Sequence, residues 1–199
     1  MAIKPILFNT EMVRAILDGR KTCTRRIMKP QLTAHYGTQY VKPPYGPGDI
    51  LYVRETWCAL PVNEAGHMRG HSVYYYKADG DLRPEGWRGN WHPSIRMPKE
   101  AARIWLKVTD VRVERLQNIT EDGAWQEGTD CWDDACYADN GWHPTFEDPD
   151  SGGNCDIIAG FEKLWNNTIK KSDLDRYGWS ANPYVFVIEF ERCEKPENL

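Results

Sequence analysis

Residues 3–26, IKPILFNTEMVRAILDGRKTCTRR, begin the fold and contain its most unusual cluster of side chains. The opening residues IKPILF predict a β-strand. The helical spacing of the apolar residues that follow predicts a helix, and Asn9 or Thr10 can cap it with a side-chain oxygen. Gly19 then marks the helix end, because glycine readily adopts the left-handed conformation found there.

The segment GRKTCTRR, residues 19–26, combines a lysine and three arginines with two threonines. Lys21 and Thr24 are expected just past the helix end, on a loop or entering a strand, where polar side chains can converge on a site. They are three positions apart, so their side chains share a face only if the segment is turn-like or helical. From the residues alone, a solvated basic patch or a contact for RNA phosphates is as open as an active site.

Composition restricts the class of protein. The chain has 199 residues, enough for one domain with a full core, and its 41% apolar and 27% charged residues are ordinary for a soluble globular protein. The net charge of −4 provides no global basic field, so any contact with nucleic acid would be local. No apolar run is long enough to span a membrane, and the N-terminus does not resemble a signal peptide. We therefore expect a cytoplasmic protein.

The rest of the chain alternates strands with short helices, which predicts an α+β domain with a mostly antiparallel sheet. Two loop insertions are expected, at about residues 56–98, around one short strand SVYYYK, and at about residues 129–155. The other expected elements are a proline-glycine turn feeding a strand (43–57), a long strand with a bulge near Asp110 (102–117), a helix that Thr120 caps (119–128), an amphipathic helix (157–169) and a final strand, YVFVIEFER (184–192).

Six cysteines occur without the spacing of a disulfide framework, so we expect them to be reduced. Cys131, Cys136, His143 and Cys155 raise the question of a metal site. Zinc sites usually show ligand pairs at short spacing, and this set does not, so the prediction is that no metal and no cofactor is bound.

Four segments in order resemble the ASCH domain family of the PUA-like superfamily: GRKTCTRR, PGDILYV, ITEDGAWQEG and YVFVIEF. The ASCH signature is a glycine, a lysine, an acid and an arginine, and Thr24 occupies the acid position here. That threonine is shared with the short bacterial N4-acetylcytidine amidohydrolases. The resemblance implies a single ASCH domain over residues 1–199, built as a PUA-like β-barrel with a few flanking helices.

The resemblance to the amidohydrolases implies that Lys21, Thr24 and Glu127 form a catalytic set. A threonine hydroxyl is a weak nucleophile that needs a neighbouring base. A lysine can be that base if burial or a nearby cation lowers its pKa, and three arginines are near in the sequence. Glu127 would deliver a proton to the leaving nitrogen. The predicted reaction is hydrolysis of an N4-acylated cytosine nucleoside to the nucleoside and a carboxylate.

Three further residues are predicted to bind the substrate. Arg26 would stabilise the oxyanion or hold a ribose or phosphate. Glu55 would pair with Arg54 or with the catalytic group. Trp57 would stack on a base, although a core tryptophan is as good an interpretation.

The sequence also resembles larger phage and prophage ASCH proteins, through RETW (residues 54–57), HPSIRMP (residues 92–98) and the closing motif WSANPY (residues 179–184). The alternative function is therefore a non-catalytic ASCH module that binds RNA or a modified nucleic acid. Tryptophans would stack bases and the basic cluster would contact phosphates, with affinity that falls steeply with salt. A nuclease has little support, because the sequence offers no histidine pair or carboxylate cluster.

Overall fold

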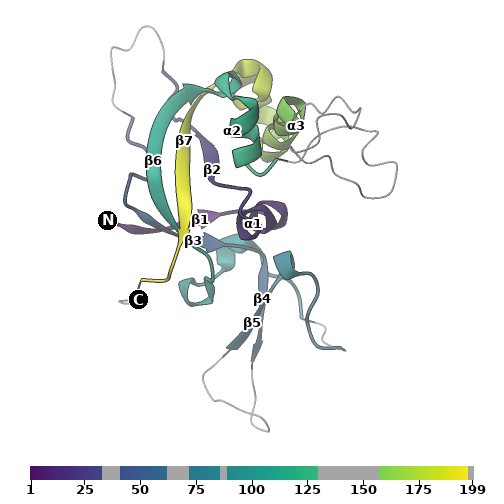
Figure 1. Ribbon diagram of the computed structural model, residues 1–199. Coiled ribbons are helices and arrows are strands. Elements are labelled where there is room, and N and C mark those ends of the chain that lie inside the picture. Colours follow the sequence, from purple (N-terminus) through teal and green to yellow (C-terminus); the bar gives the residue numbers. More distant parts are fainter. Residues whose placement is uncertain (33–40, 62–71, 86–88, 130–156, 197–199) are drawn as a thin grey trace, which may run out of the picture. The chain divides into compact units, whose positions relative to one another are not determined.

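The computed structural model describes residues 1–32, 41–61, 72–85, 89–129 and 157–196 (Figure 1). The chain packs as two compact units, each built from separated stretches of sequence. The first unit contains Met1–Gly19, Tyr45–Thr109 and Phe190–Leu199. The second unit contains Arg20–Pro44 and Asp110–Glu189.

A five-stranded sheet has the strand order β1-β3-β6-β7-β2. β1 and β3 are parallel, whereas β3 with β6 and β2 with β7 are antiparallel. The α+β fold with a mostly antiparallel sheet is therefore confirmed. The strands are β1 (Ile3–Leu7), β2 (Cys23–Ile27), β3 (Ile50–Arg54), β6 (Trp105–Arg115) and β7 (Tyr184–Cys193).

The expected closed barrel is wrong, because this sheet is open. Closure requires the first and last strands of the order to exchange ladder hydrogen bonds. Here β1 and β2 stand at the two ends of the order, and each is a short edge strand of five residues. Short edge strands are one way in which open sheets avoid pairing with other chains.

In the first unit, helix α1 (Thr10–Leu17) follows β1 as expected, and Asn9 caps it by accepting a hydrogen bond from the Met12 backbone N–H. β4 (Trp57–Pro61) and β5 (Ser72–Tyr76) form an antiparallel hairpin. The sequence predicts only the second of these strands. Buried side chains from β3, β6 and the segment between β5 and β6 form the core of this unit, namely Ile50, Met97, Ala101, Ala102 and Trp105.

In the second unit, helices α2 (Glu121–Gln126) and α3 (Ile157–Thr168) pack next to each other (Figure 1). Their apolar faces meet side chains of β2 and β7, including Ile27, Val185 and Val187. α2, α3 and β7 correspond closely to the expected elements. A one-turn helix, α4 (Leu174–Tyr177), precedes the final strand.

Short 3-10 helices connect the larger elements, namely η1 (Lys77–Asp79), η2 (Ser94–Arg96), η3 (Lys99–Ala101), η4 (Leu116–Asn118), η5 (Lys171–Asp173) and η6 (Trp179–Ala181). Within the described part of the chain, no helix has the length and apolar character that crossing a membrane requires.

Candidate active site

Lys21 lies two residues before β2, in the second unit. The backbone N–H of Thr22 donates to the carbonyl oxygen of Gln126 at 2.9 Å, which ties the chain entering β2 to the end of α2. The Lys21 side chain is almost completely buried, and its Nζ donates to two oxygens of Glu127. One is the backbone carbonyl oxygen and the other is Oε2, each at 2.7 Å.

Glu127 is positioned by helix α2. Thr120 begins this helix by accepting a hydrogen bond from the Gly123 backbone N–H at 3.1 Å. Glu127 is the C-cap residue, and Gly128 follows with a φ of 74°, a conformation that favours glycine. The sequence predicted both helix ends correctly. Glu127 therefore lies at the point where the short helix ends, with only 4% of its surface exposed.

Arg25 is the second cation at the Glu127 carboxylate. Its Nη1 lies 3.3 Å from Glu127 Oε1 and donates to the Gly123 carbonyl oxygen at 3.4 Å. Its Nη2 lies 3.7 Å from an oxygen of Glu114, on β6. Two cations and two carboxylates thus meet in one cluster, which we call the Lys21–Glu127 cluster (Lys21, Arg25, Glu114 and Glu127).

The sequence does not identify Arg25 as a site residue, although its charge is close to Lys21. A signal was available in the alternation of β2, since Cys23, Arg25 and Ile27 share one face of the strand. Both neighbours on that face are apolar, which indicates that Arg25 is buried. A buried guanidinium needs an anion close to it. Gly123 is a second signal, because a glycine inside a helix costs about 1 kcal/mol relative to alanine, and close packing is one reason to accept that cost.

The burial of these charges has a large electrostatic cost. The side chains of Lys21, Arg25 and Glu127 are 1%, 3% and 5% exposed. Ions removed from water lose several kcal/mol of hydration each, by order-of-magnitude estimate, unless pairing and hydrogen bonds offset the loss. Among the described residues, Arg25 Nε and Thr129 Oγ1 are buried polar atoms with no hydrogen-bond partner. Buried polar groups without a hydrogen-bond partner are candidates for a functional site.

Cys23 lies beside the cluster, with Sγ 3.9 Å from the Gly123 carbonyl oxygen and 3.7 Å from Arg25 Nη1. Burial raises the pKa of its thiol to about 12, and the charge of Glu127 adds to this effect. The cations Arg25 and Lys21 oppose it more weakly. Cys23 is therefore a neutral thiol at physiological pH, and the reactive thiolate form is not available.

Thr24 lies on β2, where it is paired with Ile188 of β7 and is 4% exposed. Because side chains alternate along a strand, Thr24 and Arg26 lie on the face opposite to Arg25. Lys21 precedes the strand, so this alternation does not fix its direction. Arg26 is partly buried and is paired with Phe186.

Glu55 belongs to the first unit, whereas the predicted catalytic residues belong to the second. It is 1% exposed, and Arg103 binds both of its carboxylate oxygens, at 2.9 and 3.0 Å. The expected pair with Arg54 is not formed, because Arg54 Nε donates to the carbonyl oxygen of Met97 instead. Burial raises the pKa of Glu55, and Arg103 lowers it by a smaller amount.

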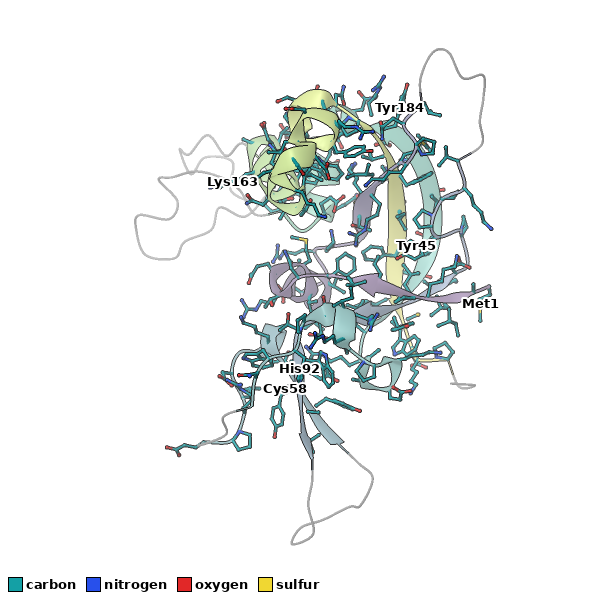
Figure 2. All side chains as sticks on the ribbon, turned by 180° about the vertical axis from the view of Figure 1, so that it is seen from behind. Met1, Tyr45, Cys58, His92, Lys163 and Tyr184 are labelled. Atoms are coloured by element: carbon teal, nitrogen blue, oxygen red, sulfur yellow. The ribbon has the colours of Figure 1, made fainter. Side chains whose placement is uncertain are left out.

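Trp57 also belongs to the first unit and starts the hairpin. Its ring centroid lies 5.8 Å from that of Tyr74 and 5.2 Å from that of His92. His92 and Cys58 lie at the base of this hairpin (Figure 2). Trp57 Nε1 is buried, and among the described residues it has no hydrogen-bond partner. The ring thus packs in an aromatic group at the edge of the core, and base stacking stays a prediction.

The residues considered for a metal site, Cys131, Cys136, His143 and Cys155, lie outside the described residues. Within residues 1–32, 41–61, 72–85, 89–129 and 157–196, no group of three or more histidine, cysteine or acidic side chains is placed to hold a metal ion.

Comparisons with known proteins give one structural similarity. No family model matches the sequence, and no curated protein matches it. Among solved structures, an ASCH domain from Lactobacillus crispatus JV V101 is similar to this chain with a TM-score of 0.46 and 11% sequence identity. The similarity covers 96% of this chain and 79% of that one.

Proposed function

We propose that this protein is an amidohydrolase that removes the acyl group from N4-acylated cytosine nucleosides. The proposal combines the motif resemblance of the sequence with the chemistry of the Lys21–Glu127 cluster. Lys21, Thr24 and Glu127 are its catalytic set.

One observation carries the proposal. GRKTCTRR and ITEDGAWQEG are the two motif segments that contribute the predicted base and acid, and the two residues are 106 positions apart in the chain. Their side chains nevertheless meet in a buried hydrogen bond of 2.7 Å between Lys21 Nζ and Glu127 Oε2. A contact of this kind supports joint acid–base action, which needs the groups within hydrogen-bond reach.

Proton transfer between Lys21 and Glu127 would supply the neutral amine and the carboxylic acid that deacylation needs. When a proton moves from Nζ to Oε2, the ammonium and carboxylate become an amine and a carboxylic acid. The amine then takes the proton of the Thr24 hydroxyl as Thr24 Oγ bonds to the acyl carbon. The carboxylic acid gives its proton to N4 of the cytosine as the carbon–nitrogen bond breaks, which releases the nucleoside and restores the ion pair.

The same groups complete the reaction with water. After a second proton transfer within the pair, the Lys21 amine takes a proton from water as the water oxygen attacks the Thr24 ester. The Glu127 acid returns a proton to Thr24 Oγ as the ester carbon–oxygen bond breaks. The carboxylic acid product leaves and gives its proton to solvent. Arg26, on the same face of β2 as Thr24, would stabilise the charged oxygen of each tetrahedral intermediate. The scheme requires no metal.

The burial of the cluster affects how the reaction proceeds. Lys21, Thr24 and Glu127 are 3%, 4% and 4% exposed, so a substrate reaches them only when neighbouring atoms move aside. In return, exclusion of water strengthens the electrostatic interactions among the reacting groups.

The same burial weakens the RNA-binding alternative. Phosphate contacts need accessible cations, and the salt dependence of binding comes from those contacts. Lys21 and Arg25 are enclosed and paired with carboxylates, so two of the four basic residues in GRKTCTRR are unsuited to contact phosphates.

The proposal is tested by incubating the purified protein with N4-acetylcytidine and a panel of larger N4-acyl cytidines. Conversion to cytidine is followed by chromatography, with Lys21→Ala and Glu127→Ala alongside. We expect turnover by the wild type and its loss in both variants. A wild type that leaves every compound intact at high protein concentration would reject the proposal. Salt-sensitive binding of single-stranded RNA by that inactive protein would favour the alternative.

A further inference from the structure

We infer that Arg25 is a positioning residue for Glu127, which fixes the rotation of its carboxylate so that Oε2 faces Lys21. This inference rests on the proposed function, because it assigns Arg25 a part in the same reaction. The motif segments predict Lys21, Thr24 and Glu127, and the structure adds Arg25 from its contacts.

The two carboxylate oxygens of Glu127 have different partners. Lys21 Nζ binds Oε2 at 2.7 Å, and Arg25 Nη1 lies 3.3 Å from Oε1. Rotation about the last side-chain bond of a glutamate is soft, so a single contact would not define which oxygen faces the base. The second cation removes that freedom. Glu127 therefore presents one defined oxygen for proton exchange with Lys21.

Arg25 is itself held in place from several sides. Nη1 also donates to the carbonyl oxygen of Gly123 at 3.4 Å, and Nη2 lies 3.7 Å from Glu114 Oε2. The guanidinium carbon lies 5.8 Å from the centre of the Phe161 ring. A planar guanidinium presents its N–H donors in a fixed arrangement, whereas a lysine ammonium is a compact charge on a flexible stem.

The helix packs closely against this arginine. A Cβ atom at Gly123 would lie 3.1 Å from Arg25 Nη2, so the absence of a side chain leaves the space that the guanidinium fills. Glu114 is shared with a third cation, because Arg112 Nε lies 2.5 Å from Glu114 Oε1, whereas Arg25 Nη2 lies 3.7 Å from Oε2. Glu127 is therefore the carboxylate that Arg25 binds more closely. When the Glu127 acid gives up its proton, Arg25 is already placed to stabilise the carboxylate that forms.

The test compares Arg25→Met, Arg25→Lys and a control, Arg115→Met, with the wild type. Arg115 is an exposed arginine on β6 that packs on the Tyr184 ring, 3.8 Å from its centre. The kcat and KM for N4-acetylcytidine are measured per folded molecule, with circular dichroism to determine the folded fraction. We expect kcat of Arg25→Met to fall by about 100-fold or more, with KM within about threefold. Arg25→Lys should lie between that variant and the wild type, and Arg115→Met should keep its kcat within about twofold.

The outcomes separate positioning from structural support. A merely structural arginine would lower the melting temperature and leave kcat per folded molecule unchanged, which would overturn the inference. If Arg25→Met does not fold, Arg25→Lys decides: a reduced kcat at an unchanged KM supports the role, and a kcat equal to the wild type rejects it. A wild type that turns over no substrate overturns the proposed function itself, whereas an active wild type with an equally active Arg25→Met overturns only the role of Arg25.

Discussion

Lys21 Nζ bridges the backbone carbonyl oxygen and the side-chain Oε2 of Glu127, at 2.7 Å to each. One lysine thus binds both the end of helix α2 and the acid that the helix presents. The fold and the proposed chemistry depend on the same side chain. Substitutions in this pair are expected to change stability and activity together, unless they are chosen to separate the two effects.

Glu127→Gln should lower turnover of an N4-acyl cytidine by about 100-fold or more, since an amide cannot exchange a proton with Lys21. It should also destabilise the fold by about 3–5 kcal/mol, because two buried cations lose a shared anion. The double variant Lys21→Met with Glu127→Leu should recover part of the stability, since Arg25 still loses its closest carboxylate, and none of the activity. Urea unfolding and the chromatographic assay measure the two effects, and activity in the double variant would contradict the catalytic assignment.

Thr24→Val removes the hydroxyl and keeps the shape of the side chain. If Thr24 is the nucleophile, its activity should fall by at least about 100-fold, and Thr24→Ser should keep activity within about tenfold of the wild type. Rates are compared at equal folded concentration. A fully active Thr24→Val would show that water attacks directly and that Lys21 and Glu127 suffice. The comparison tests directly whether Thr24 is the nucleophile, because Thr24 lies on the face of β2 opposite to Arg25.

Gly123→Ala introduces a Cβ atom 3.1 Å from Arg25 Nη2 and 3.2 Å from Ile119 Cγ1. Alanine favours the helix by about 1 kcal/mol over glycine, which should offset much of the cost of moving these neighbours. We therefore expect a small change in the free energy of unfolding and a clear loss of kcat, because the arginine is displaced from Glu127. Gln126→Ala, at an exposed position of the same helix, serves as the control. Unchanged kcat in Gly123→Ala would show that Arg25 tolerates the displacement.

The ionised carboxylate of Asp49, in the first unit, should stabilise the fold at neutral pH, and this stabilisation should disappear in acid. The hydrogen bond from Lys4 is the largest of the effects that lower its pKa to about 2, and the backbone N–H groups of Ala2 and Gly46 contribute. Its pKa in the unfolded chain is about 3.9. A lowered pKa stabilises the fold fully above the unfolded value, and this contribution is lost as the pH falls toward 2.

We therefore expect Asp49→Asn to be less stable than the wild type at pH 7, with a difference that shrinks from pH 5 to pH 2. Lys4→Met should show the same trend, since it removes the strongest partner. Urea midpoints across this range measure the effect. A difference that does not vary with pH would mean that the carboxylate charge contributes nothing.

Arg103→Met should make stability fall as the pH rises. The variant leaves the Glu55 carboxyl buried without its guanidinium, so its pKa, already raised by burial, rises further. The unfolded chain then ionises first, so the folded state loses stability as the pH rises above the unfolded pKa of about 4.3. Adding Glu55→Gln to this variant should abolish the dependence. If the stability of the double variant still falls as the pH rises, another titratable group causes the pH dependence.

The sequence predicts the local elements of this protein well, and the reason is that their signals are local. Asn9 and Thr120 cap helices, and Gly19 and Gly128 end them with φ values of 80° and 74°. These features depend on neighbouring residues only. β4 was missed because its partner β5 follows a long intervening segment, so no short-range turn signal indicates the hairpin.

Contacts between residues far apart in the sequence could be predicted only through the motif resemblance. It selected Lys21 and Glu127, which the structure brings together. Within these segments, the apolar neighbours of Arg25 and the helical Gly123 indicate a buried arginine, but they do not specify its partners. Arg25 and Glu114 approach through the packing of β2, β6 and α2, which is a tertiary property. The open sheet was missed for a similar reason, because closure depends on how the end strands pair rather than on their patterns.

The short length of α2 has a consequence for where Glu127 is presented. Thr120 fixes the first turn, Gly128 fixes the exit, and only six residues lie within the helix. Each added or removed residue between them would rotate Glu127 by about 100° and shift it by about 1.5 Å along the axis. The number of residues that follow Thr120 in the helix therefore sets the position and direction of Glu127. The count of residues in α2 is as much a part of the candidate site as the identity of the acid at its end.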